Sequence, residues 1–132
     1  MPKVLIVDDS AVDRRLAGGL LEKRVGITAA EKRTGITNLF AVNGKEALAL
    51  MERELPDVVL TDMQMPEMTG LELQQNLNRR GLQIPTIIIT AHDESGMREK
   101  CESAGAIAYL SKPVQGTSLF DAIEATGATG NT

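Results

Sequence analysis

The sequence has few aromatic side chains and almost no cysteine. Among its 132 residues there are no Trp, one Tyr, two Phe and one Cys. Nucleic-acid surfaces use stacked aromatic rings and basic patches, so this scarcity and the net charge of −4 argue against direct nucleic-acid binding. The single thiol, Cys101, has no disulfide partner within the chain. We therefore expect a reducing compartment and a place for Cys101 in the core.

The sequence also lacks a long apolar run. Its longest runs fall far short of the roughly 20 residues that a membrane-spanning helix needs. The start does not resemble a signal peptide, because Lys3 leads straight into a short apolar run and two aspartates. Apolar residues make up 42% and charged residues 24%, as in ordinary globular proteins. One small, acidic, cytoplasmic domain with no membrane partner is predicted.

Five short apolar runs, most of them β-branched, recur along the chain. Such continuous runs are typical of strands buried on both faces of a parallel sheet. The stretches between them have apolar residues at helical spacing, for example Val12, Leu16 and Leu20. Strand and helix alternate five times, which predicts a doubly wound α/β fold around a five-stranded parallel sheet. The predicted strands are residues 4–7, 39–42, 58–60, 86–90 and 107–110.

Helix starts and ends are marked by residues with known capping preferences. Gly81 and Gly105 stand where helices should end, whereas Gly18 and Gly19 disfavour the first helix by roughly 1 kcal/mol each relative to Ala. The predicted N-terminal caps are Asp9 or Ser10, then Asn43, Thr69, residues 93–95 and residues 117–118.

One short segment is duplicated. Residues 22–28 (EKRVGIT) return as residues 31–37 (EKRTGIT), and only one of the seven positions differs. The period is too short for a repeat architecture. We interpret the duplication as a tolerated insertion between the first helix and the second strand, with a new dimer or partner surface as the alternative. Residues 1–126 are predicted to form the domain and residues 127–132 a flexible tail.

Polar side chains follow four of the five predicted strands. Asp8 and Asp9 come after the first strand, Asp62 after the third, Thr90 closes the fourth and Lys112 follows the fifth. Ligands of an open parallel sheet bind outside the carboxyl ends of its strands. Each residue alone would be an ordinary cap, turn or loop residue, but together they predict a site at this edge of the sheet.

The chemistry of this group points to a cation and a phosphoryl group. Clustered carboxylates repel one another and need a counter-charge. An all-oxygen site suits Mg²⁺ or Mn²⁺, which also bind phosphate oxygens. A hydroxyl and an ammonium group can hold further phosphoryl oxygens, and a carboxylate can attack phosphorus.

At these residues the sequence resembles the receiver domain of two-component response regulators. The resemblance covers nearly the whole chain and implies a flavodoxin-like sheet with strand order 2-1-3-4-5. The matching segments are residues 4–10 (VLIVDDS), 43–48 (NGKEAL), 56–62 (PDVVLTD), 65–70 (MPEMTG), 85–91 (PTIIITA) and 109–113 (YLSKP).

The resemblance implies a role for each residue of the site. Asp62 would accept a phosphoryl group from a phosphohistidine on a sensor histidine kinase or a phosphotransfer protein. Asp8, Asp9, Asp62 and the backbone carbonyl of Gln64 would hold Mg²⁺, with Mn²⁺ possible. Lys112 would bind a phosphoryl oxygen. The kinase or phosphotransfer protein would contact the start of the first helix, around residues 11–15.

The resemblance also implies a switch. Thr90 would move toward the phosphoryl group and free space for Tyr109 to turn inward, which changes the face formed by the fourth helix, the fifth strand and the fifth helix. Pro113 would follow a cis peptide. Gln64 and His92 occupy the two positions that tune the lifetime of the phosphoryl group in this family. A downstream protein, or a second copy in a phosphorylation-dependent dimer, would bind the changed face.

The predicted function is therefore a signalling switch with slow self-dephosphorylation, and not a metabolic enzyme. One alternative is a phosphorylation-independent interaction module on the same fold. The other is a small aspartyl-phosphate phosphohydrolase, but the second aspartate of its acid/base pair is absent, since Gln64 stands there, and no cap domain is visible. Twenty residues follow Lys112, too few for an effector domain. The chain is expected either to act alone by protein contact or to be a fragment.

Overall fold

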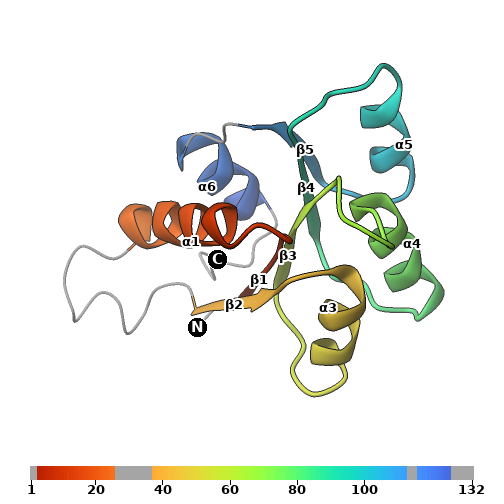
Figure 1. Cartoon of the computed structure of the whole chain (residues 1–132), viewed down its shortest axis with the longest axis horizontal. Helices are drawn as coiled ribbons and strands as arrows, with labels where there is room; N and C mark the ends of the chain where they lie inside the picture. Colours follow the sequence, from red (N-terminus) through yellow and green to blue (C-terminus); the bar gives the residue numbers. More distant parts are fainter. Residues whose placement is uncertain (1–2, 26–36, 113–115, 126–132) are drawn as a thin grey trace.

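The computed structural model describes residues 3–25, 37–112 and 116–125. Five strands form one parallel sheet in the order β2-β1-β3-β4-β5, with helices on both of its faces (Figure 1). This confirms the predicted α/β class and strand order. The elements are β1 (Lys3–Val7), α1 (Ala11–Val25), β2 (Thr37–Ala41), α3 (Gly44–Met51), β3 (Val58–Asp62), α4 (Gly70–Arg79), β4 (Thr86–Thr90), α5 (Met97–Ser103), β5 (Ala108–Ser111) and α6 (Gly116–Ala125).

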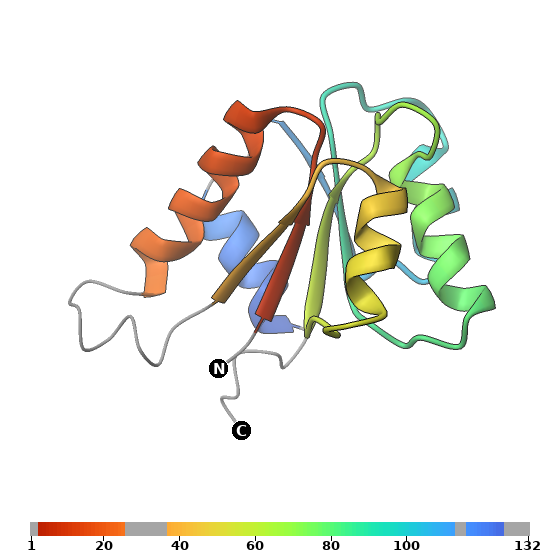
Figure 2. The same ribbon diagram turned by 60° about the horizontal axis from the view of Figure 1, so that its bottom comes forward.

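The two faces of the sheet have separate cores. Figure 2 shows α1 and α6 on one side of the sheet and α3 and α4 on the other. Along β1, Val4 and Ile6 pack with the α6 side, whereas Leu5 and Val7 pack with the α3 and α4 side. Both faces of the central strands are therefore buried, which is why their sequences are continuously apolar.

The apolar spacing of the first helix predicts the helix but not its buried side. Val12 and Leu16 are 65% and 61% exposed, so they do not belong to the core. Gly18 is buried instead, and a Cβ there would lie 3.3 Å from the Phe40 ring and from the Asn38 side chain of β2. The glycine that disfavours the helix locally thus lets α1 approach the edge strand.

Most predicted helix ends are confirmed. Asn43 and Thr69 cap α3 and α4 with their side chains, and Gly81 and Gly105 have the left-handed φ values of 72° and 111° that favour glycine after a helix. The prediction that residues 93–95 open the fourth helix is wrong. The helix starts at Met97 behind Gly96, whose φ of 81° turns the chain and leaves no side-chain cap.

The start of the last helix also differs from the prediction, since α6 begins at Gly116, before residues 117–118. Most of the duplication, Pro113 and the predicted tail at 127–132 lie outside the described residues. The domain boundary at residue 126 stays a prediction. Among the described residues, no helix is long and apolar enough to cross a membrane.

Candidate functional site

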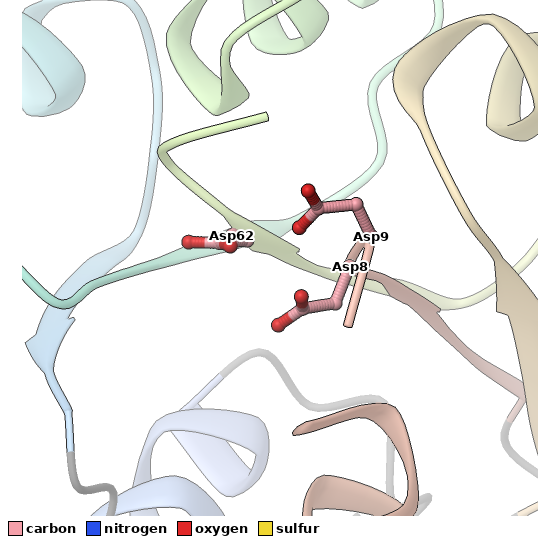
Figure 3. Close-up of side chains that lie close together, drawn as sticks. All are labelled: Asp8, Asp9 and Asp62. Atoms are coloured by element: carbon pink, nitrogen blue, oxygen red, sulfur yellow. The ribbon is translucent and has the colours of Figure 1, made fainter. Parts of the chain in front are cut away.

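Three carboxylates converge at the carboxyl ends of β1 and β3 (Figure 3). One oxygen from each of Asp8, Asp9 and Asp62 lies within 4.8 Å of the other two. Asp8 and Asp62 are buried and Asp9 is exposed. The Asp8 N–H donates to the Ala41 carbonyl oxygen at 3.1 Å, which extends the β1–β2 ladder by one residue and fixes where this side chain begins.

Lys112 brings a positive charge to the same place from the end of β5. Its backbone N–H donates to the Thr90 carbonyl oxygen at 2.7 Å. Its Nζ lies 2.8 Å from Asp13 Oδ2, 3.2 Å from Asp8 Oδ2 and 3.5 Å from Asp62 Oδ2. Burial alone would lower the pKa of Lys112, but the hydrogen bond to Asp13 and the charges of Asp8 and Asp62 outweigh it and raise that pKa above its ordinary value.

The Asp62 carboxyl lies in an excess of negative charge. Burial, followed by the charge of Asp8, raises its pKa above the ordinary value, against the opposing effects of Lys112 and of the Gln64 N–H, which donates to Asp62 Oδ1 at 3.3 Å. One ammonium group therefore does not balance the carboxylates. This imbalance and the all-oxygen donor set fit a hard divalent cation such as Mg²⁺ or Mn²⁺, held by Asp8, Asp9 and Asp62.

Thr90 is fully buried and lies in a small polar network. Its hydroxyl has two acceptors at 2.9 Å, Gln64 Oε1 and the His92 carbonyl oxygen, and it accepts the His92 N–H at 3.1 Å. The hydroxyl has one proton and can donate to only one of the two acceptors at a time. Thr90, the predicted switch residue, is thus joined directly to Gln64 and His92, the two positions predicted to tune the phosphoryl lifetime.

Tyr109 already lies inward. Only 1% of the residue is exposed, and its ring belongs to a buried cluster with Met63, Ile88 and Cys101. The Arg98 guanidinium lies 5.2 Å from the ring centroid. The buried hydroxyl has no hydrogen-bond partner within the described part of the chain, and burial raises its pKa. In this structure the ring is thus already in the inward position, and the switch role of Tyr109 stays a prediction. The predicted core position of Cys101 is confirmed.

The start of α4 lies directly behind the acceptor candidate. A Cβ added at Gly70 would lie 2.6 Å from the Asp62 carbonyl oxygen, and the Gly70 N–H donates to the Met63 carbonyl oxygen at 3.0 Å. Only a residue without a side chain allows this approach.

Sequence reasoning missed Asp13 as a member of the site. Acids are common in the first turn of a helix, where they interact favourably with the helix dipole, so Asp13 has an ordinary explanation by itself. Its partner Lys112 is 99 residues away in the sequence. The available signal was its position in the helix that follows Asp8 and Asp9, which places it near the same edge of the sheet.

The chain is similar to known proteins over nearly all its length. The family of response regulator receiver domains matches residues 4–124. A protein-glutamate methylesterase/protein-glutamine glutaminase of Treponema denticola is 36% identical over 84% of this chain. Sporulation initiation phosphotransferase F of Bacillus subtilis is 32% identical, over 92% of this chain and 90% of its own length.

The solved structure of FixJ-N has a TM-score of 0.81 to this chain at 29% identity, and the match covers 100% of this chain and 96% of that one. Against the methylesterase/glutaminase relative the chain spans only 28% of the length, so the catalytic activity in that relative's name is not carried over. The family match and the common strand order lead to one conclusion: this chain belongs to the response regulator receiver domains of two-component signalling.

Proposed function

We propose that the chain is a phospho-accepting switch and that Asp62 is its acceptor. The observation that carries this proposal is the position of the Asp62 carboxylate. It is buried at the end of β3, and Asp8, Asp9 and the Lys112 ammonium group all lie beside it. A carboxylate in such a place can attack phosphorus while neighbouring charges balance the phosphoryl oxygens.

The proposed step transfers a phosphoryl group from a phosphohistidine of a sensor kinase or a phosphotransfer protein. An Asp62 carboxylate oxygen forms a bond to phosphorus as the P–N bond breaks, and the imidazole leaves with that electron pair. Hydrolysis later breaks the new P–O bond, which returns the carboxylate and releases inorganic phosphate. Lys112 lies 3.5 Å from Asp62 Oδ2 and supports both steps as a cation for the phosphoryl oxygens.

A divalent cation completes the charge balance of this site. Asp8, Asp9 and Asp62 would hold it, with the Gln64 carbonyl as the fourth proposed ligand, and when bound it neutralises carboxylate charge and polarises phosphoryl oxygens. The Asp8 N–H bonds to the Ala41 carbonyl oxygen, and Asp62 pairs with Ile89 of β4, so both backbones are fixed at the ends of their strands. Mg²⁺ is the proposed ion, since it binds carboxylates and phosphates together.

The proposed readout passes through Thr90 and Tyr109. The Thr90 hydroxyl would leave Gln64 and His92 for a phosphoryl oxygen. Tyr109 is already packed inward against Arg98. The proposed change is therefore that the ring becomes more tightly restrained in this position. A downstream protein, or a second copy of the chain, would read the face of α5, β5 and α6.

The test is intact-mass spectrometry after incubation with acetyl phosphate and Mg²⁺. The expected result is one phosphoryl adduct on the wild-type chain that needs Mg²⁺, decays with time and is absent from Asp62→Asn. Asp121→Asn is the matched control, because it removes the same carboxylate charge at an exposed position of α6. Its adduct should equal that of the wild type.

An adduct that persists in Asp62→Asn would reject Asp62 as the acceptor. Absence of any adduct on the wild-type chain, in the presence of Mg²⁺ and at high acetyl phosphate concentration, would reject the switch. It would favour an interaction module that works without phosphorylation.

A further inference from the structure

The first turn of α1 has an acidic side chain that does not complete its own helix cap. Ser10 Oγ accepts the Asp13 N–H at 3.2 Å. In a full capping box the acid at that third position accepts the N–H of the capping residue in return. Here the Ser10 N–H donates to Asp8 Oδ1 instead, at 2.9 Å. The Asp13 carboxylate is therefore left for another partner.

That partner is Lys112. The distance of 2.8 Å from its Nζ to Asp13 Oδ2 is shorter than those to Asp8 and Asp62, at 3.2 and 3.5 Å. Charge-assisted N–H···O bonds have their best length near 2.7–2.9 Å. The ammonium group thus makes its best hydrogen bond to α1, and its contact with Asp62 is the longest of the three.

The ion pair lies at the wall of a cavity and not inside a packed core. A cavity of about 600 Å³ has Asp13 and Lys112 in its lining, together with apolar residues of the sheet and α6 such as Leu60 and Leu119. On the same turn and the next, Val12 is 65% exposed, and Leu16, which also lines the cavity, is 61% exposed. The start of α1 is therefore held by polar contacts and not by a packed apolar face.

We propose that Asp13 is a positioning residue for phosphoryl transfer, which keeps the Lys112 ammonium group closer to α1 than to Asp62, at 2.8 Å against 3.5 Å, until Asp62 carries a phosphoryl group and then releases it. This inference rests on the proposed function. A phosphoryl group adds up to two negative charges and strong acceptor oxygens, so it attracts Lys112 more strongly than the single charge of Asp13 does. When Lys112 moves, Asp13 loses its partner and the first turn of α1 loosens.

The rate of adduct formation from acetyl phosphate tests the first half of the proposal. Asp13→Asn keeps the size of the side chain and removes its charge, so Lys112 becomes free for the incoming group. The rate should rise about fivefold, as expected for the loss of one partly exposed ion pair. Asp13→Glu, which keeps the charge, should stay within about twofold of the wild type. Melting temperatures of all variants show whether folding is affected.

Glu72→Gln is the matched control. Glu72 occupies the corresponding third position of α4, but it bonds back to its own capping residue, Thr69. The variant therefore has the same change in net charge and the same position in a helix, without a contact to Lys112. Its rate should equal that of the wild type.

Hydrogen exchange of the full chain tests the second half. Beryllofluoride with Mg²⁺ serves as the phosphoryl mimic, and residues 11–16 are compared with residues 70–77. In the wild type the mimic should speed exchange in the first segment severalfold and leave the second unchanged. In Asp13→Asn the first segment should exchange fast with or without the mimic.

Two results would overturn the inference while the proposed function survives. One is an adduct that forms on Asp13→Asn no faster than on the wild type at an unchanged melting temperature. The other is exchange in residues 11–16 that does not respond to the mimic in the wild type. Failure of the wild type to form any adduct would overturn the proposed function and the inference together.

Discussion

Two helices that both begin at the functional edge of the sheet, α4 and α1, are held in different ways. In α4, Leu73 and Leu77 are fully buried, and Thr69 and Glu72 form a complete capping box. In α1 the large apolar residues of the first two turns are exposed, and polar contacts secure its start: the Ser10 cap, the ion pair of Asp13 with Lys112, and the Arg14 guanidinium, which donates to the Asp8 carbonyl oxygen at 2.6 Å.

The difference separates a fixed helix from a responsive one. Apolar packing and a self-contained cap do not depend on the charge of the site, so α4 provides a rigid support behind Asp62. The start of α1 depends on Asp8 and Lys112, which belong to the site itself. A change in the charge of the pocket should therefore reach α1 before it reaches α4.

The largest expected effect is a loss of stability when the apolar packing of α4 is removed. Leu77→Ala should lower the free energy of unfolding by about 2–5 kcal/mol, because it leaves a cavity under a fully buried side chain. Leu16→Ala removes the same atoms from a residue that is 61% exposed, so its cost should stay within about 0.5 kcal/mol. Denaturant unfolding of both variants gives the comparison. Equal losses would mean that α1 is packed as firmly as α4.

The next effect concerns the contact between α4 and the acceptor. Gly70→Ala places a Cβ 2.6 Å from the Asp62 carbonyl oxygen, where only a backbone shift can relieve the clash. A cost of about 1–3 kcal/mol is expected, together with slower adduct formation, since the shift moves Asp62. Denaturant unfolding and the acetyl phosphate assay measure the two effects.

Gly19→Ala is the control for that substitution. A Cβ at Gly19 meets nothing within 4 Å, so the variant should be stabilised by about 1 kcal/mol through helix propensity alone and keep its adduct. A Gly70→Ala chain as stable and as active as Gly19→Ala would contradict the role of Gly70.

The fold was predictable because its signals are local and repeated. Continuous β-branched runs such as Thr86–Thr90 identify buried parallel strands without knowledge of their partners. The rule that ligands bind beyond the carboxyl ends of such strands then directs attention to Asp8, Asp62 and Lys112. Neither step needs a contact that is distant in the sequence.

The wrong and missing predictions concern features that tertiary contacts determine and that the local sequence does not specify. Spacing alone does not say which side of a helix is buried, and in α1 it is Gly18, not Leu16, that approaches the sheet. A polar stretch at residues 93–95 looks like a cap, but the left-handed turn at Gly96 sets the start of α5. The partner of Asp13 comes from the other end of the chain and has no local signal.

The smallest expected effects come from substitutions at the N-terminal caps of α4 and α1, which compare the two caps directly. Thr69→Ala removes one half of a closed capping box, so it should cost about 1 kcal/mol and speed exchange in the first turn of α4. Ser10→Ala removes only the acceptor for the Asp13 N–H. Because Lys112 still holds Asp13, we expect a smaller loss, of about 0.5 kcal/mol. Denaturant unfolding with hydrogen exchange measures both. If Ser10→Ala costs more than Thr69→Ala, the cap and not the ion pair secures α1, and the contrast between the two helices disappears.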